Sequence, residues 1–223
     1  MSSREAILGK LRGALAAGGA MEDERRAAVD VRLTNPRVNV IPARGQLDYL
    51  GQVDLFCRMA ESVQATVARV DSNAAVPAAV TEHLRRHNLP AQLRMGADPR
   101  LAALPWSDTQ LEVRPGPSDG NDAVGLSHAE AGVAETGTLV LLSGPDNPTT
   151  INFLPDTHIV VLRAADIVGD YESVWRQLRD KLGPGVMPRL VNMITGPSRS
   201  ADIEQTLLLG AHGPRALHIV LVG

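Results

Sequence analysis

The sequence predicts an α/β sandwich with a largely parallel sheet, and two observations carry this prediction. Stretches typical of strands alternate with stretches typical of helices along most of the 223 residues. Two of the strand stretches, 138–142 and 158–162, are apolar at nearly every position, as strands buried on both faces of a sheet are. Because only 3% of the residues are aromatic, we expect a core built mainly from aliphatic side chains.

The expected elements follow one another from residue 47 onward. Helices are expected where apolar residues recur with helical spacing, at 47–61, 74–87, 98–104, 171–182 and 201–209. Strands are expected at the short aliphatic runs, 65–70, 111–113, 123–127, 138–142, 158–162, 190–195 and 216–222, with a short apolar piece at 92–95. The consecutive strands at 123–127 and 138–142 indicate a hairpin or a mixed region of the sheet.

Residues 1–45 are predicted to be an appendage of an α/β domain at 46–223. A capping box at 2–5 starts a helix, which Gly18-Gly19 ends. A polar stretch and two X-Pro pairs then indicate a loosely structured, extended arm. The apolar residues on one face of the first helix are Ile7, Leu8, Leu11 and Leu15. That face needs a partner, either the main body or another subunit, and the sequence does not choose between them.

Composition excludes several classes of function. A formal net charge of −3 argues against a broad surface for binding polyanions, and the few aromatic residues argue against a single-stranded nucleic-acid platform. We find no signal peptide and no apolar stretch long enough to cross a bilayer, so we expect a cytoplasmic protein. Cys57 is the one cysteine, which rules out a disulfide within these residues or a cluster held by several of their cysteines.

The junction at 190–204 is the first candidate site. A strand, a Gly/Pro turn rich in hydroxyls and a helix capped by Ser200 would direct backbone N–H groups and the helix dipole at one point. The predicted anion-binding residues are Gly196, Ser198, Arg199, Ser200 and Asp202 of this junction, together with Thr136, Gly137 and Gly213 elsewhere in the chain. The alternative is that these side chains only cap the helix, and the acids at 202 and 204 count against a simple phosphate site.

The second candidate precedes the strand at 138–142. Glu135 is the only acid in a run of small residues, beside Thr136 and Gly137, and glycines allow a ligand to approach the backbone closely. A partly desolvated carboxyl group suits a general base or nucleophile. The alternative is a structural glutamate that accepts hydrogen bonds from N–H groups of the turn.

Histidines form the third class of candidates. His128, His158 and His212 each lie beside an expected strand end, at spacings unlike a compact metal motif, so no metal site is predicted. His212 is the most informative because Gly213-Pro214 restricts its loop. The sequence contains no P-loop and no early dinucleotide-binding GxGxxG motif.

Four motifs in order resemble the LUD-domain family, with the lactate-utilisation protein C type as the most similar branch. They are residues 134–138, 153–158, 196–204 and 212–214, and the resemblance runs from about residue 50 to the end. Ser200 stands where the family usually has threonine, which keeps the hydroxyl group. The resemblance implies a three-layer α/β/α sandwich similar to the CoA-transferase and ribose-phosphate isomerase group.

The resemblance also implies a role in a three-component system that oxidises L-lactate to pyruvate. The iron–sulfur clusters of such a system are associated with partner proteins, so no cofactor is expected in this chain. The first hypothesis is therefore an accessory or substrate-binding subunit. In it, the turn at 196–202 binds a small carboxylate or phosphate, and Glu135 and His212 line the same pocket as candidate catalytic groups.

Two alternatives stay open at this point. One is a stand-alone enzyme, similar to a CoA-transferase or a sugar-phosphate isomerase, that uses Glu135. The other is a scaffold that docks partners through its first helix. The sequence leaves open whether the chain catalyses a reaction by itself.

Overall fold

The computed structural model describes residues 3–16, 19–203, 206–210 and 212–223. Its helices are α1 (Ser3–Ala16), α2 (Gly19–Thr34), α3 (Tyr49–Ser62), α4 (Val76–Arg86), α5 (Pro99–Ala102), α6 (Thr150–Phe153) and α7 (Tyr171–Leu182). Its strands are β1 (Thr66–Val70), β2 (Gln92–Met95), β3 (Glu112–Pro115), β4 (Val124–His128), β5 (Ala131–Val133), β6 (Thr138–Leu142), β7 (Thr157–Arg163), β8 (Ile167–Val168), β9 (Val191–Ile194), β10 (Arg199–Ile203), β11 (Thr206–Leu209) and β12 (Ala216–Val222).

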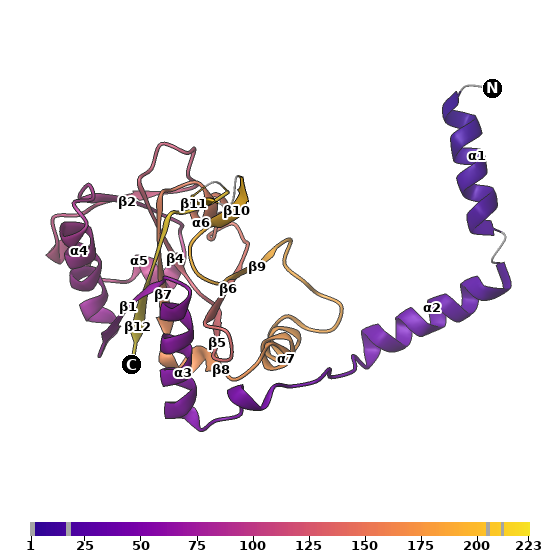
Figure 1. Ribbon diagram of the computed structural model, residues 1–223, viewed down its shortest axis with the longest axis horizontal. Coiled ribbons are helices and arrows are strands. Elements are labelled where there is room, and N and C mark those ends of the chain that lie inside the picture. Colours follow the sequence, from indigo (N-terminus) through magenta and orange to yellow (C-terminus); the bar gives the residue numbers. More distant parts are fainter. Residues whose placement is uncertain (1–2, 17–18, 204–205, 211) are drawn as a thin grey trace.

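A six-stranded sheet in the order β1-β12-β7-β4-β2-β3 forms the centre of the fold (Figure 1). Every pairing in it is parallel. Side chains of β7 alternate between two cores: Ile159 and Val161 pack on the side of α4 and α5, whereas Val160 and Leu162 pack on the side of α3. The predicted α/β class, with a parallel sheet flanked by helices, is confirmed.

A second sheet, in the order β8-β5-β6-β9, shares the core on the α3 side. Of the two arrangements expected for 123–127 and 138–142, the hairpin is wrong, because β4 joins the parallel sheet and β6 pairs instead with β5. The sheet that contains β6 is mixed, since β5 pairs antiparallel with β6 and parallel with β8. The β5 strand gives a weak signal because it has three residues with Gly132 at its centre. A Cβ on Gly132 would lie 2.8 Å from Leu162 Cδ2 and 3.0 Å from Phe56 Cε2, so the glycine permits close packing.

Helix α7 covers the outer face of this second sheet. Val174 and Leu178 of α7 are buried against residues of β5 and β6. Asp170 caps the helix by accepting a hydrogen bond from the backbone N–H of Ser173 at 2.8 Å. The observed bounds agree with the predicted helix at 171–182.

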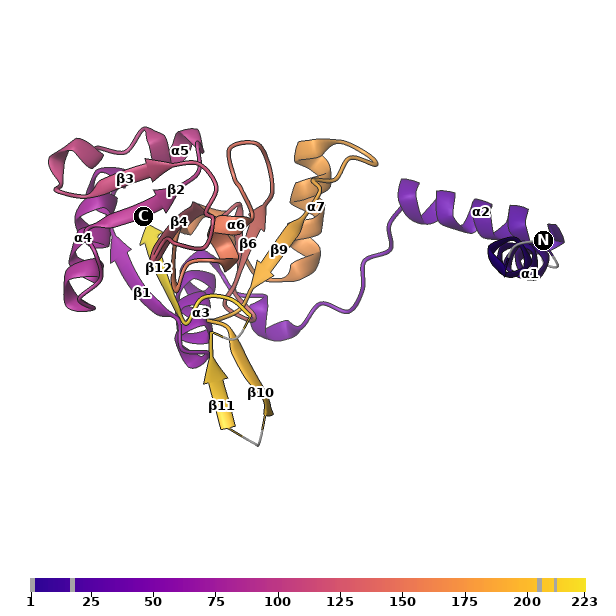
Figure 2. The same ribbon diagram turned by 90° about the horizontal axis from the view of Figure 1, so that it is seen from above.

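The helix predicted at 201–209 is wrong, and the structure has an antiparallel hairpin of β10 and β11 in its place. Figure 2 shows this hairpin extending away from both sheets. A short apolar run such as 206–209 does not distinguish a helix from a strand by periodicity alone. Since no helix begins at Ser200, the predicted cap and helix dipole at this point are also absent from the described backbone.

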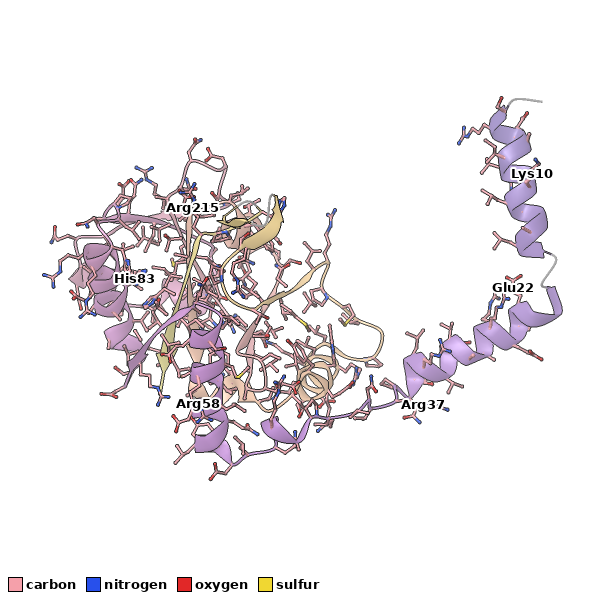
Figure 3. The ribbon with its side chains drawn as sticks, viewed as in Figure 1. Lys10, Glu22, Arg37, Arg58, His83 and Arg215 are labelled. Carbon is pink, nitrogen blue, oxygen red and sulfur yellow. The ribbon has the colours of Figure 1, made fainter. Side chains whose placement is uncertain are left out.

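Two helices of the N-terminal region lie apart from the sheets, and Figure 3 shows Lys10 and Glu22 on them. Helix α1 matches the expected first helix, but α2 occupies the stretch expected to be loose. Alanine, glutamate and arginine favour this second helix, and Arg26 and Glu22 pair across one turn at 3.6 Å. The apolar residues Ile7, Leu11 and Leu15 of α1 are exposed.

We expect the turn between β5 and β6 to tolerate no side chain at Gly137. This residue has φ +68°, and a Cβ on it would lie 2.3 Å from the backbone nitrogen of Ala60 in α3. Gly185 is a matched control, with φ +74° and open space around it. Gly185→Ala should reduce the free energy of unfolding by about 1 kcal/mol through backbone strain. Gly137→Ala should reduce it by about 2–4 kcal/mol, because overpacking adds to the strain. Urea unfolding followed by circular dichroism measures both, and equal losses would contradict the close contact.

Candidate functional site

A cavity of about 240 Å³ lies at the amino ends of β7 and β12. Its walls come from α6, the first residues of the two strands, the end of β9 with the turn that follows, and the loop before β12. Of the predicted site residues, the cavity brings together Gly196, Ser198, His212 and Gly213. Two separate motifs of the sequence therefore meet here.

Ser198 joins the turn after β9 to the loop before β12. Its backbone N–H donates to the carbonyl of Pro214 at 2.8 Å, and its carbonyl accepts from the N–H of Gly210 at 3.0 Å. Its hydroxyl oxygen accepts from the backbone N–H of His212 at 3.3 Å. The Ser198 hydroxyl is thereby oriented and has its own proton to donate.

His158 is the most deeply buried polar residue of the cavity wall, with 1% of its surface exposed. Its Nε2 lies 3.0 Å from the hydroxyl oxygen of Ser127, and that hydroxyl donates to Oδ1 of Asn152 at 2.8 Å. Burial lowers the pKa of His158 to about 3. Its Nδ1 is buried with no hydrogen-bond partner among the described residues.

Sequence reasoning considered His158 but did not select it, and it missed Ser127 and Asn152 entirely. A signal was present, because His158 interrupts an otherwise apolar strand. Ser127 lies on the neighbouring strand β4, and Gly125 of that strand is the register partner of His158. Only the pairing of β4 with β7 brings the two side chains together.

Arg199, predicted to supply the positive charge, is exposed on β10 and is not among the residues that line the cavity. The side chains of Ser200 and Asp202 lie outside the part of the chain whose side chains the structure describes. Within the described lining there is no arginine or lysine. An anion held here would therefore depend on neutral hydrogen-bond donors.

Glu135 is buried elsewhere, with 4% of its surface exposed. Its backbone N–H donates to Gly169 O at 3.1 Å, and a Cβ on Gly45 would lie 3.3 Å from the Glu135 Cβ. One carboxyl oxygen, Oε2, has no partner among the described residues. Glu135 and its neighbours Thr136 and Gly137 do not line the cavity that holds His212.

A cluster of hydroxyl groups nevertheless connects the two motifs. Thr138 Oγ1 lies 2.7 Å from Thr136 Oγ1, 2.8 Å from the Tyr171 hydroxyl and 2.7 Å from Thr195 Oγ1. Thr195 lines the cavity. The turn that carries Glu135 is thus joined to the cavity wall by hydrogen bonds, although the carboxyl group itself does not reach it.

The opposite edge of the parallel sheet is closed. The strand order reverses between β2 and β4: the next strand of this sheet after β2 is its neighbour β3 on one side, and the next after β4 is its neighbour β7 on the other. Ligands of open α/β sheets commonly bind at the carboxyl ends of the strands at such a switch point. Here Arg100 pairs with Asp98 at 2.6 Å and with Glu130 at 3.3 Å, and Lys181 of α7 also pairs with Glu130. The void at the carboxyl ends of β2 and β4, whose walls include Gly96 and His128, measures about 10 Å³, which is about the space for one water molecule.

A group of histidines lies between α4 and β12, beside a cavity of about 360 Å³. The rings of His83 and His218 stack with centroids 3.8 Å apart, and His218 Nδ1 lies 2.7 Å from Thr66 Oγ1. Figure 3 labels His83 on α4. Burial lowers the pKa of His83 to about 4 and that of His218 to about 3. Among the described residues no three histidine, cysteine or acidic side chains are placed to hold a metal ion.

Cys57 is a buried free thiol of α3, beside Arg69. Burial raises its pKa, and the neighbouring Arg69 opposes that effect to a smaller extent. A thiol with a raised pKa is a poor nucleophile and a poor metal ligand at neutral pH. The structure therefore gives this side chain a packing role.

Comparison with known proteins shows that the C-terminal part of the chain is similar to a known family. Residues 120–222 match the LUD domain, a narrower range than the resemblance suggested. A crystal structure of a DUF162 family protein from Deinococcus radiodurans aligns with a TM-score of 0.56 and 23% identity, over 79% of this chain and 99% of that one, which supports the fold. The similarity to the LUD domain thus covers residues 120–222.

Several of the similar proteins share one name. Lactate utilization protein C of Geobacillus thermodenitrificans is 40% identical over 100 residues, and that of Bacillus subtilis is 39% identical over 100 residues. Each alignment covers 44% of this chain and 42% of the relative. An uncharacterized protein of Neisseria meningitidis is 38% identical over 102 residues, 46% of this chain and 43% of that protein. The resemblance to the lactate utilization protein C type is confirmed over this shared part, which spans less than half of each relative.

None of the helices in the described part of the chain is long and apolar enough to cross a membrane.

The buried histidines predict how stability depends on pH. In the unfolded chain they titrate near pH 6.5, whereas His83 in the folded chain stays neutral down to about pH 4 and His158 and His218 down to about pH 3. Between these values the unfolded state binds more protons, so the free energy of unfolding falls as the pH falls from about 6.5.

His83→Phe keeps a ring in the stack and removes one of these titrations. We expect it to reduce the loss of stability between pH 7 and pH 4 by about 1–3 kcal/mol. His212→Gln, at an exposed position, is the control. Urea unfolding at a series of pH values measures the slope, and an unchanged slope in His83→Phe would contradict the prediction.

Proposed function

We propose that this chain is the non-cluster component of a system that oxidises L-lactate to pyruvate, and that it binds a small anionic ligand in the cavity at the amino ends of β7 and β12. The names of the relatives support the system, since several are called lactate utilization protein C. The cavity supports the binding role. The main observation is that Ser198 and His212, which belong to separate sequence motifs, both line this cavity.

The lining favours a carboxylate over a phosphate. Ser198 and the glycine-rich backbone on either side of it offer neutral donors, and the described lining contains no arginine or lysine. Burying a charge without a cation is costly, and the cost is larger for a doubly charged phosphate than for a singly charged carboxylate. A small carboxylic acid held by hydrogen bonds is the ligand class that fits.

The electron-carrying clusters would belong to partner proteins. An iron–sulfur cluster is usually held by four cysteines, and these 223 residues contain one, which is buried in α3. We therefore propose a division of labour in which this chain binds a ligand or supports its partners and the cysteine-rich components carry electrons.

The stand-alone enzyme that uses Glu135 receives less support. A nucleophilic carboxylate must come within about 3 Å of the atom that it attacks. Glu135 is almost fully buried next to Gly45 and Gly169, and it does not line the cavity. Acyl transfer would require residues around Gly45 to move away first.

Titration calorimetry with L-lactate, pyruvate and inorganic phosphate tests the binding role. Ser198→Ala should weaken the binding of the carboxylates about 5- to 50-fold, because it removes a hydrogen-bond donor to a charged group. Arg199→Ala is the matched control, because its side chain is exposed outside the cavity, and it should change the dissociation constant less than about twofold.

The proposal fails if none of these ligands produces heat or a thermal shift in the wild-type protein. It also fails if Arg199→Ala weakens binding as much as Ser198→Ala does, because the anion would then be held at the hairpin rather than in the cavity.

A further inference from the structure

Strand β1 is an open edge of the parallel sheet. It lies at one end of the strand order, and among the described strands it pairs with β12 alone. The carbonyl of Val70 accepts a hydrogen bond from Gly223 N–H at 3.0 Å, on the β12 side. Successive residues of a strand point their backbone groups to opposite edges. Val67 and Arg69 therefore direct their N–H and C=O groups away from the sheet.

The opposite edge, β3, is protected in a way that β1 is not. Strand β3 ends at Pro115, which has no N–H, and its Glu112 and Arg114 form an ion pair at 2.8 Å. Proline and charged side chains on an edge strand prevent another strand from pairing with it. Strand β1 contains no proline, and Arg69 is its one charged residue. This edge can therefore accept a further strand.

A hollow lies on each side of the β1 edge. The hollow on the α4 side measures about 360 Å³, and its walls include all five residues of β1 and Ala79 of α4. The hollow on the α3 side measures about 410 Å³, and its walls include Val67 and Arg69 of β1 and Glu61 of α3. A strand added to β1 would point alternate side chains into these two hollows. The edge thus has space for the side chains of an added strand as well as for its backbone.

Residues 37–41, with the sequence Arg-Val-Asn-Val-Ile, have the side chains of a strand but belong to no strand. Val38 is 58% exposed and Val40 is 86% exposed, although valine favours strands. The described hydrogen bonds of this segment's N–H groups go to side chains. Asn39 N–H donates to Glu172 Oε1 at 3.3 Å, and Val40 N–H donates to Asn39 Oδ1 at 2.8 Å. The segment therefore lacks a strand partner within its own chain.

The segment and the open edge lie apart in one chain. Figures 1 and 2 both show β1 on the far side of the sheets from α7, beside which the segment leaves the domain, and Figure 3 shows Arg37 beyond the sheets. We propose that residues 37–41 of one copy of this chain add as a strand to β1 of a second copy. Two copies would then exchange their N-terminal arms and form a dimer with two equivalent junctions.

The apolar side chains of the segment fit the hollow on the α4 side. In a strand, Val38 and Val40 share one face, and Arg37 lies on the other. The hollow on the α4 side offers Ala79, Ala68 and part of Val70 as apolar contacts. Placing both valines there removes two exposed apolar side chains from water.

Charge then favours Arg37 in the hollow on the α3 side. On the α4 side the acid is Glu82, which already pairs with Arg85 and Arg86 at 2.6 Å. A further cation would be unpaired there.

The acids of the α3 side offer Arg37 a partner. Two acids, Asp54 and Glu61, face Arg58 and Arg69 in that hollow. Asp54 pairs with Arg69 at 2.7 Å, whereas Glu61 has no ion-pair partner among the described residues. Arg37, likewise without a described ion-pair partner in its own chain, would lie near Glu61 of the second copy.

Two substitutions at one position test the edge. Arg69→Pro removes the outward N–H and keeps the hydrogen bonds to β12, whereas Arg69→Ala keeps that N–H and removes the same ion pair with Asp54. Sedimentation velocity at about 1–100 µM measures the dissociation constant of the dimer, and circular dichroism checks that each variant is folded. We expect Arg69→Pro to raise the constant at least about tenfold above that of Arg69→Ala. A wild-type protein that is monomeric at the highest concentration, or equal constants for the two variants, would overturn the inference.

Substitutions in the arm test the donated strand. Val38→Asp combined with Val40→Asp places charges on the face that enters the α4-side hollow, and should raise the dissociation constant at least about tenfold. Val186→Asp combined with Met187→Asp is the control, because these side chains are 52% and 51% exposed at a distant loop, and it should change the constant less than about twofold. If the arm variant dimerises as well as the control, β1 pairs with another segment, such as β1 of the second copy, and the inference is wrong.

A mixture of the two weakened variants gives a result specific to exchange. The Arg69→Pro chain has an intact arm, and the variant with both aspartates has an intact edge. In equal amounts they should form a heterodimer with one junction at a concentration at which each variant alone is monomeric. Native mass spectrometry identifies the heterodimer by its mass. Absence of the heterodimer would show that the arm does not donate a strand to β1.

Discussion

The close approach of the two sheets at Gly132 is the constraint on which the rest of the structure depends. A side chain at this position would overlap Leu162 of the parallel sheet and Phe56 of α3, so only glycine allows β5 and its neighbours to pack this tightly. Because β9 pairs with β6, the position of β6 decides where the end of β9 lies. The turn after β9 then meets the start of β7 and β12, and the cavity forms between them. The site is thus a product of core packing more than of any local motif.

Sequence reasoning found the elements whose patterns are long and unambiguous. The helix at 171–182 and the strand at 216–222 were predicted with the bounds that the structure has, because amphipathic and uniformly apolar stretches of this length fit one element only. The hairpin of β10 and β11 was missed, since its short apolar run suits a helix equally well. The strand β5 was missed because its central glycine carries no hydrophobic signal.

The candidate site was predicted in part, and the reason lies in how its members are brought together. Gly196, Ser198, His212 and Gly213 belong to turns that the sequence marks by glycine and proline, so their importance was visible. The expectation that Glu135 lines the same pocket is wrong, because Glu135 follows β5 in the second sheet and is buried there. Ser127 and Asn152 could not be predicted, because their place beside His158 depends on how β4 pairs with β7, and one sequence does not specify that register. The described part of the cavity lining contains no arginine or lysine, unlike phosphate sites that depend on an arginine.

The ion pairs at the carboxyl edge give the two ends of the parallel sheet different responses to the solvent. Opposite charges connect the end of β2, the β4–β5 connection and α7: Arg100, Glu130 and Lys181 are at least partly exposed, whereas Asp98 is buried. Such pairs weaken as ionic strength rises, whereas hydrogen bonds from neutral donors at the amino edge are affected far less. Salt should therefore weaken the contact of α7 with this edge, whereas the ligand binding that we propose for the cavity should depend on it far less. The fold thus places the charged ion pairs and the proposed binding cavity at opposite ends of the same strands.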